Sequence, residues 1–244
     1  MPFTFSHPAA VLPLDYLSKR WLSLTALVIG SLTPDFEYFL RMKVSAQYSH
    51  TWSGLFWFDV PLGLLLMLVY VIVVKDKLIT HLPDWLNRRF SNFRGKGHNI
   101  NLLYSVVIIM STLIGATSHI LWDSFTHPAG YFVKHHRLLR HKALLMHYHV
   151  ELYNILQHLS TVIGAIAILY SIYKLPKGNS TAVGSNEILY YWLKVIGIAV
   201  LVLIIRTLTG LSISQYGDVI VTLISGFLIG LIIASASTKF KQAA

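Results

Sequence analysis

The 244-residue sequence contains no cysteine, which excludes disulfide bonds and thiolate metal sites. Charged residues are also scarce, at 12% of the chain, whereas a typical soluble domain carries about 25%. Only ten residues are acidic, and the twelve histidines outnumber them. Hydrophobic residues make up 55% of the chain and the mean hydropathy is +0.59. This composition favours a membrane protein over a soluble domain.

Five apolar segments are long enough to cross a hydrocarbon core, which takes about 20 helical residues. They are Leu55–Val74, Leu102–Asp123, Ile155–Tyr173, Ile188–Ile205 and Val219–Ser235. A sixth, Leu22–Thr33, is shorter, and it either crosses, re-enters or lies in the interface. Because lipid offers the backbone no hydrogen bonds, these segments should be helices. We therefore expect an all-α fold, an integral membrane helical bundle with about five or six hydrophobic helices.

The basic residues bear on partners and orientation. A net charge of +10 in a membrane protein favours basic loops that fix orientation, so we expect membrane lipids as partners and no nucleic acid. If all six segments cross, one side carries 12 Lys and Arg and the other carries 7. The positive-inside rule then places residues 75–101 in the cytoplasm and residues 124–154 outside.

The segment from Lys174 to Glu187, rich in Gly and Ser, has the composition of a flexible connector. It separates a membrane domain that carries the His and Asp residues, residues 1–175, from a C-terminal pair of transmembrane helices, residues 176–244.

One motif in the chain has the spacing of metal ligands. His119 and Asp123 are four residues apart, so they share one face of a helix and can point at one ion. Pro128 biases His127 away from helical geometry, which lets His127 fold back over the same site just past the helix end. Imidazole and carboxylate are ligands of zinc and similar divalent metals.

Further polar residues fall near the same membrane boundary. Thr33-Pro34-Asp35 has the pattern of a helix start with Thr33 as N-cap, and His50 precedes the helix that begins near Leu55. His158 lies at the start of a later hydrophobic helix. Ionisable groups at such depth are costly unless they pair or bind a ligand, which favours a functional role.

Structural interpretations compete with each of these. His50 alone suits a surface histidine at the interface, and the pair His119 and Asp123 suits a structural hydrogen bond. The histidines between His135 and His149 lie among basic residues and favour a solvated or headgroup-facing surface.

Several motifs together resemble a known family. They are MPFTFSHPAA from Met1, LTPDFEYF from Leu32, Ser49-His50, HILWDSFTH from His119 and QHLS from Gln157. In this order they closely resemble the bacterial membrane-protein family of unknown function numbered 4184, over most of residues 1–175. That family in turn resembles bacterial inner-membrane proteins described as metal-dependent hydrolases, which share an N-terminal His, a Pro-Asp pair, a later His and a His-x-x-x-Asp.

The resemblance adds His7 to the metal ligands Asp35, His50, His119 and Asp123, with zinc as the expected divalent metal. If Leu22–Thr33 crosses the membrane, however, His7 lies on the side opposite Asp35 and cannot join them.

Three functions remain open. The first is a membrane-embedded metal-dependent hydrolase of the bacterial inner (plasma) membrane, acting on a phosphoester of a lipid or envelope precursor. In it, His127 or His158 would serve as the catalytic base, and Lys134, Arg137 and Arg140 would hold an anionic lipid-linked substrate. The second is a non-catalytic membrane protein with a structural His/Asp cluster, and the third is a metal or proton transporter.

Overall fold

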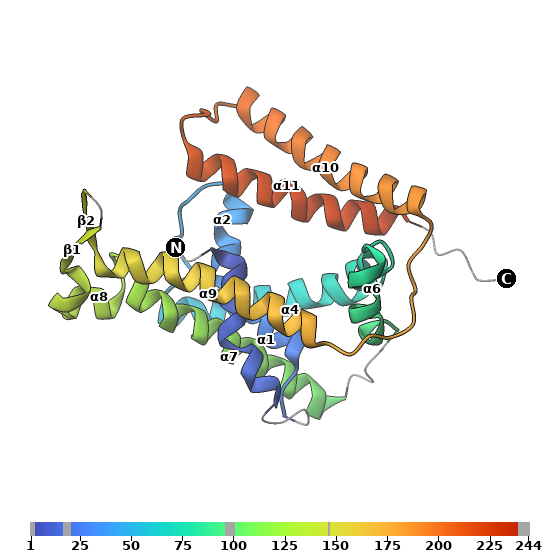
Figure 1. Cartoon of the computed structure of the whole chain (residues 1–244), viewed down its shortest axis with the longest axis horizontal. Coiled ribbons are helices and arrows are strands. Elements are labelled where there is room, and N and C mark those ends of the chain that lie inside the picture. Colours follow the sequence, from blue (N-terminus) through green and yellow to red (C-terminus); the bar gives the residue numbers. More distant parts are fainter. Residues whose placement is uncertain (1–2, 17–20, 96–100, 146, 239–244) are drawn as a thin grey trace. The chain divides into compact units, whose positions relative to one another are not determined.

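The computed structural model describes residues 3–16, 21–95, 101–145 and 147–238 (Figure 1). The chain forms two compact units that interleave along the sequence. Unit 1 comprises Met1–Asp35, Gln47–Leu64 and Asn99–Lys174, and unit 2 comprises Phe36–Ala46, Leu65–His98 and Leu175–Ala244. These units do not test the expected division into residues 1–175 and 176–244, which stays a prediction.

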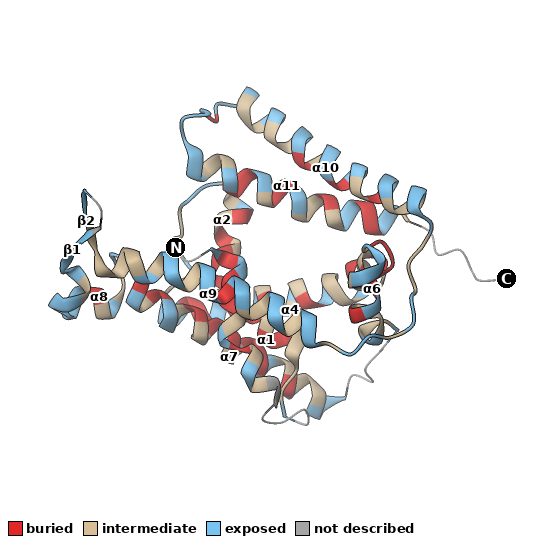
Figure 2. Cartoon of the chain, viewed as in Figure 1, coloured by how far each residue is buried: buried red, intermediate tan, exposed pale blue. Residues whose placement is uncertain are grey.

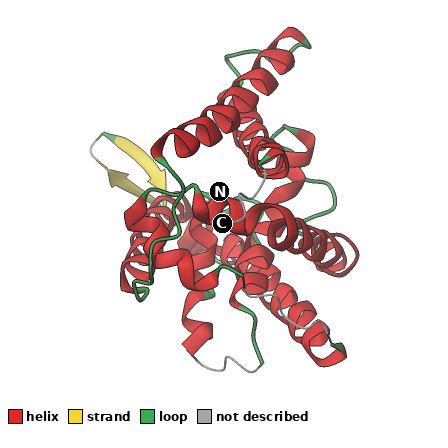
Figure 3. Cartoon of the chain, turned by 90° about the vertical axis from the view of Figure 1, so that its right-hand side faces the viewer, coloured by secondary structure: helices red, strands yellow, loops and turns green. Residues whose placement is uncertain are grey.

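Unit 1 contains helices and one small hairpin, which is yellow in Figure 3. The longer helices are α7 (Leu102–Thr126) and α9 (Leu152–Lys174), and the hairpin pairs β1 (Lys142–Leu145) with β2 (Tyr148–Glu151). The shorter α-helices are α1 (Leu24–Leu32), α3 (Trp52–Gly54) and α8 (Tyr131–His135), with the first half of α4 (Val60–Val69). The 3-10 helices are η1 (Thr4–Ala10), η2 (Leu12–Tyr16), η3 (Thr33–Asp35) and η7 (Arg137–Arg140), and η4 (Leu55–Asp59) is a π-helix.

Unit 2 is built around two long antiparallel helices, α10 (Ser185–Leu208) and α11 (Tyr216–Ser237). Its other elements are α2 (Phe36–Arg41), the π-helix η5 (Tyr70–Val74), α5 (Lys75–Thr80), α6 (Asp84–Phe90) and the 3-10 helix η6 (Ser91–Phe93). Tyr191, Val195 and Ala234 form the buried contact between α10 and α11. There the Tyr191 hydroxyl lies 2.9 Å from Ser235 Oγ.

Five helices in the described residues are long and apolar enough to cross a membrane: Trp52–Thr80, Leu102–His135, Leu152–Lys174, Ser185–Leu208 and Tyr216–Ser237. They coincide with the five segments expected from the sequence, which confirms the helical bundle and makes the chain a multi-pass membrane protein. α9 carries exposed large apolar side chains along its length, and in Figure 2 its residues alternate between exposed and intermediate. Such a surface is stable against acyl chains but not against water.

The sixth segment is not among the described helices that are long and apolar enough to cross a membrane. α1 has 9 residues and is about 14 Å long, less than half of the roughly 30 Å hydrocarbon core. If these five helices alone cross, two crossings separate the described residues 21–51 from residues 127–145, and the two stretches share one side of the membrane. The orientation stays a prediction.

α1 packs closely along α7 because both helices carry glycine at the crossing. A Cβ on Gly30 would collide with the backbone of Thr112, and one on Gly115 would collide with the backbone of Leu27 and Ser31. Small residues allow this approach between membrane helices. The buried residues of α7 follow one face that ends in His119, Asp123 and Thr126. This crossing therefore brings α1 and the η3 turn beside the polar end of α7.

The expected helix start at Thr33 is wrong. Thr33 has helical dihedral angles as the C-cap of α1, and its hydroxyl donates to the carbonyl of Ile29, four residues back. The chain continues through the 3-10 turn η3, which needs no amide hydrogen from Pro34. Asp35 lies in this turn and is fully buried.

Candidate metal centre

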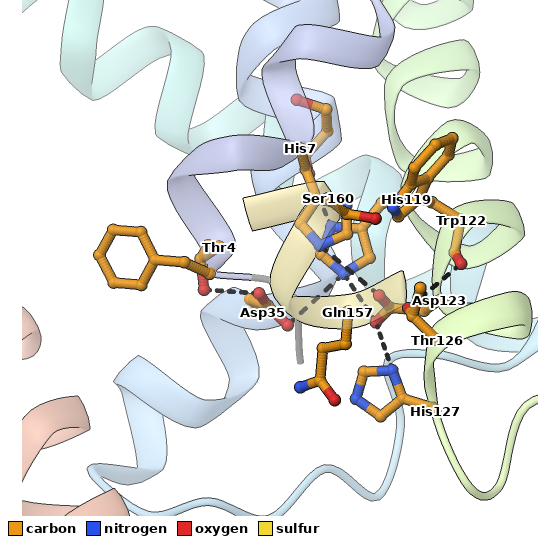
Figure 4. A network of polar contacts seen from close by, with 12 residues as sticks. Thr4, His7, Asp35, His119, Trp122, Asp123, Thr126, His127, Gln157 and Ser160 are labelled. Carbon is orange, nitrogen blue, oxygen red and sulfur yellow. Dashed lines mark hydrogen bonds and ion pairs between the residues drawn. The ribbon is translucent and has the colours of Figure 1, made fainter. Parts of the chain in front are cut away.

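Four side chains from three segments of unit 1 direct ligand atoms at one place. Asp35 lies in η3, His50 precedes α3, and His119 and Asp123 lie one turn apart on α7. One ligand atom from each lies within 4.8 Å of the others. The sequence predicted this convergence of Asp35, His50, His119 and Asp123, and the structure brings the four together. Figure 4 shows Asp35, His119 and Asp123 in this arrangement.

The separations match those between the ligands of one ion. His119 Nε2 lies 3.4 Å from Asp123 Oδ2 and 3.5 Å from Asp35 Oδ1. His50 Nε2 lies 3.5 Å from the same Asp123 oxygen and 3.4 Å from the same Asp35 oxygen. Donors of a tetrahedral zinc site, with bonds of 2.0–2.2 Å, are about 3.3–3.6 Å apart. Hydrogen bonds are shorter, at about 2.7–3.2 Å.

The buried charge of the cluster calls for a cation. Asp35 and Asp123 are 0% and 5% exposed, and their carboxylates face the same point. Two buried carboxylates so close repel each other strongly unless a cation lies between them. In the described residues, Asp35 Oδ1, both Asp123 oxygens and His119 Nε2 have no hydrogen-bond partner. A divalent ion would satisfy Asp35 Oδ1, Asp123 Oδ2 and His119 Nε2, so the residues present fit a metal.

The atoms that face away from the cluster are held by other groups. The Thr4 hydroxyl donates to Asp35 Oδ2 at 2.6 Å, and His119 Nδ1 lies 2.7 Å from the Ser31 carbonyl oxygen. Since a carbonyl can only accept, His119 Nδ1 carries a proton and donates it, and Nε2 faces the cluster, where it could bind a metal ion. Ser49 Oγ lies 2.9 Å from His50 Nδ1. Such contacts orient metal ligands and fix the histidine tautomer.

The conformation of His50 is unusual for a residue other than glycine, because its φ angle is +59°. Left-handed backbone costs free energy for a residue with a side chain and gathers at functional sites. Here it turns the chain between the buried Ser49 and the N-cap of α3, Thr51, whose hydroxyl accepts from Gly54 N–H. The turn sets the imidazole of His50 against both carboxylates.

The electrostatic field favours a cation at this point. Burial lowers the pKa of His50, but the carboxylates of Asp123 and Asp35 outweigh burial and leave that pKa raised. Burial raises the pKa of Asp35, but the imidazoles of His119 and His50 outweigh it and leave that pKa lowered. Both shifts have the sign that stabilises positive charge between the carboxylates.

His7 also reaches the cluster, which settles the question left open by the sequence. Its Nε2 lies 3.6 Å from Asp123 Oδ1, and its ring stacks on that of His119 with centroids 3.7 Å apart. Burial and then the neighbouring His119 lower the pKa of His7 to about 3, so its imidazole is neutral and able to act as a ligand. Because α1 is not a span, His7 and Asp35 can share one site.

The two predicted catalytic histidines differ in position. His127 ends α7 in extended geometry, as Pro128 predicted, and its Nδ1 lies 3.5 Å from Asp123 Oδ2. His158 is exposed on α9, and no contact joins it to the cluster among the described residues. The sequence did not predict the contacts of Thr4, Ser31 and Ser49, although Thr4 and Ser49 lie within motifs that carried the resemblance.

The chain belongs to the family described as domain of unknown function DUF4184, whose model matches residues 1–236. The match extends beyond the 1–175 region of the resemblance and includes both C-terminal helices. A search of curated proteins finds no match, and a search of solved structures finds none either. Family membership therefore assigns no activity, and a functional argument has to come from the site.

Proposed function

We propose that this member of the DUF4184 family is a membrane-embedded hydrolase that holds a divalent metal ion, zinc by its donor set, through Asp35, His50, His119 and Asp123. The proposed substrate is a phosphoester of a lipid or envelope precursor. The observation that carries the proposal is the convergence of four ligand atoms within 4.8 Å from three separate segments of the chain. Two imidazoles and two carboxylates form a common donor set for zinc.

One side of the His/Asp cluster is partly exposed to solvent, which favours a reactive metal site over a structural one. The side chains of His50 and His127 are 21% and 23% exposed, whereas those of Asp35 and His119 are fully buried. Structural metal sites are closed by protein ligands, and catalytic sites keep a position for water or substrate. The edge at His50 and His127 gives a substrate a way in.

His127 has a position suited to moving a proton. A bound divalent ion would lower the pKa of a coordinated water and polarise the scissile group. Asp123 faces His127 Nδ1 and orients the ring, which leaves His127 Nε2 to accept a proton from water and return it to the leaving group. We assign no step to His158, because it is exposed away from these contacts.

The surroundings of His127 suit an anionic lipid headgroup. α8 folds back on the end of α7, where Phe132 stacks on Phe125 with centroids 4.1 Å apart. The same segment carries the exposed Lys134, Arg137 and Arg140. Exposed Trp52 and Trp122 lie near the ends of two spans, as is typical at the headgroup level. The bacterial inner membrane stays the predicted location.

The test is phosphate release by the purified protein in nanodiscs that contain phosphatidic acid, a lipid phosphomonoester. We expect hydrolysis that a chelator abolishes and added zinc restores. His127→Gln should retain the metal and lose at least about 100-fold in turnover, as expected for general acid–base catalysis. His158→Gln, the matched exposed histidine, should behave as wild type. Metal-loaded protein with no turnover on phosphoesters would contradict the proposal and favour a structural cluster.

A further inference from the structure

His7 faces a different oxygen from the other histidines. Its Nε2 lies 3.6 Å from Asp123 Oδ1, whereas His50, His119 and His127 all lie nearest to Asp123 Oδ2. The imidazole is 4% exposed, and its Nε2 has no hydrogen-bond partner among the described residues. His7 is also not among the four residues whose ligand atoms lie within 4.8 Å of one another. One ion therefore leaves a buried nitrogen and a buried carboxylate oxygen unused.

The rings of His7 and His119 are nearly parallel, with centroids 3.7 Å apart and planes inclined by 16°. Each ring directs its Nε2 at a different oxygen of one carboxylate (Figure 4). Ions bound at the two nitrogens would lie about as far apart as the stacked rings. Two-metal sites hold their ions about 3.5–4 Å apart. We propose that His7 Nε2 and Asp123 Oδ1 hold a second divalent ion, with Asp123 bridging the two.

The position of His7 is fixed by the packing of η1 on α9. Ser6 Oγ donates to the carbonyl of Thr161 at 3.1 Å, and the amide of Phe3 donates to Thr161 Oγ1 at 3.0 Å. A Cβ on Gly164 would collide with Ser6, so the two elements are in close contact. The nitrogen of His7 is therefore held beside Asp123 by backbone packing, as a preorganised ligand requires.

A second ion also narrows the substrate class. Asp35 and Asp123 supply two negative charges, which one divalent ion balances. Two ions leave a net charge of +2, and the second has only two protein ligands, so its remaining positions are open. An anionic group that bridges both ions, such as a phosphate ester, would balance this charge and fill the open coordination positions of the second ion. The second ion should bind more weakly than the first.

This inference rests on the first metal site of the proposed function, and the metal stoichiometry separates the two. Metal-free protein in detergent is titrated with Mn²⁺ and followed by metal analysis and electron paramagnetic resonance. We expect two ions per chain, the second bound more weakly, with the spectrum of a spin-coupled pair. His7→Gln should bind one ion with an uncoupled spectrum. His158→Gln should bind two, as wild type does.

Other outcomes of the metal titration would overturn the second site. One ion per chain in both wild type and His7→Gln overturns the second site and leaves the first. One ion in wild type that His7→Gln loses makes His7 a ligand of the single ion, which also overturns the second site. Wild type without bound metal removes both sites. If His7→Gln lowers the melting temperature sharply, His7→Asn and the stoichiometry of wild type decide instead.

Discussion

At the scale of single residues, the four metal ligands could be predicted from the sequence, but the groups that hydrogen-bond to these ligands could not. His119 and Asp123 follow from helical spacing, and His127 follows from Pro128 (Figure 4). The contacts that orient these ligands depend on tertiary structure. Thr4 meets Asp35 across 31 positions, and Ser31 meets His119 across 88. No local sequence pattern predicts contacts between residues so far apart in the chain, so the role of Thr4 could not be predicted from its N-terminal motif.

The Thr4 hydroxyl should tune the metal site without forming part of it. Thr4→Val keeps the shape of the side chain but removes the donor to Asp35 Oδ2. Because such contacts orient ligands, we expect zinc affinity to fall about 10–100-fold while the fold is kept. Competition with a chromophoric chelator measures the affinity. Thr112→Val is the matched control, since Thr112 is also buried but donates to the carbonyl of Ile108 in its own helix. Equal affinities in the two variants would contradict this role.

The backbone at His50 predicts which substitutions separate ligation from folding. Asparagine tolerates left-handed φ angles better than β-branched residues do. His50→Asn should therefore lose the metal and keep the melting temperature of the metal-free protein. His50→Val should lose the metal and also lower that melting temperature, because it adds backbone strain. Scanning fluorimetry on chelator-treated samples measures both, and two equal melting temperatures would argue against strain at this position.

At the scale of elements, five spans were predictable because length and hydropathy decide them. The placement of Leu22–Thr33 was not predictable, since its 12 residues suit a crossing, a re-entrant segment or a helix in the interface. The structure resolves it through the crossing of α1 with α7. The Thr33 prediction failed because the chain continues as a 3-10 turn through Pro34, where local cap preferences favoured a new start.

That crossing should be intolerant of added volume. Gly30→Ala places a Cβ against the backbone of Thr112, which cannot move as a flexible side chain would. We expect a loss of about 1–3 kcal/mol in unfolding free energy, as for other overpacked sites. Gly197→Ala on α10 is the control, because nothing lies within 4 Å of the position. Denaturation in detergent compares the two, and a neutral Gly30→Ala would mean that the helices are less close than described.

At the scale of the whole molecule, the spans imply a topology that holds whichever way the chain is oriented. Residues 1–51 and 127–151 are separated by two crossings, whereas residues 81–101 follow one. The absence of cysteine makes labelling clean. Single cysteines at Tyr48 and Tyr148 should react with an impermeant reagent from the same side, and one at Asn92 should react from the other. Labelling of Tyr48→Cys and Tyr148→Cys from opposite sides would contradict a metal site shared by these regions.

The central claim is that Asp35, His50, His119 and Asp123 hold a metal ion, and metal content tests it most directly. Purified wild type, loaded with zinc and passed over a desalting column, should retain at least one ion per chain. Asp123→Asn keeps the size of the side chain but removes the anionic ligand, so retained zinc should fall to below about a tenth. Asp84→Asn, an exposed acid on α6, should retain as much as wild type. Folded Asp123→Asn with the zinc content of wild type would contradict the account.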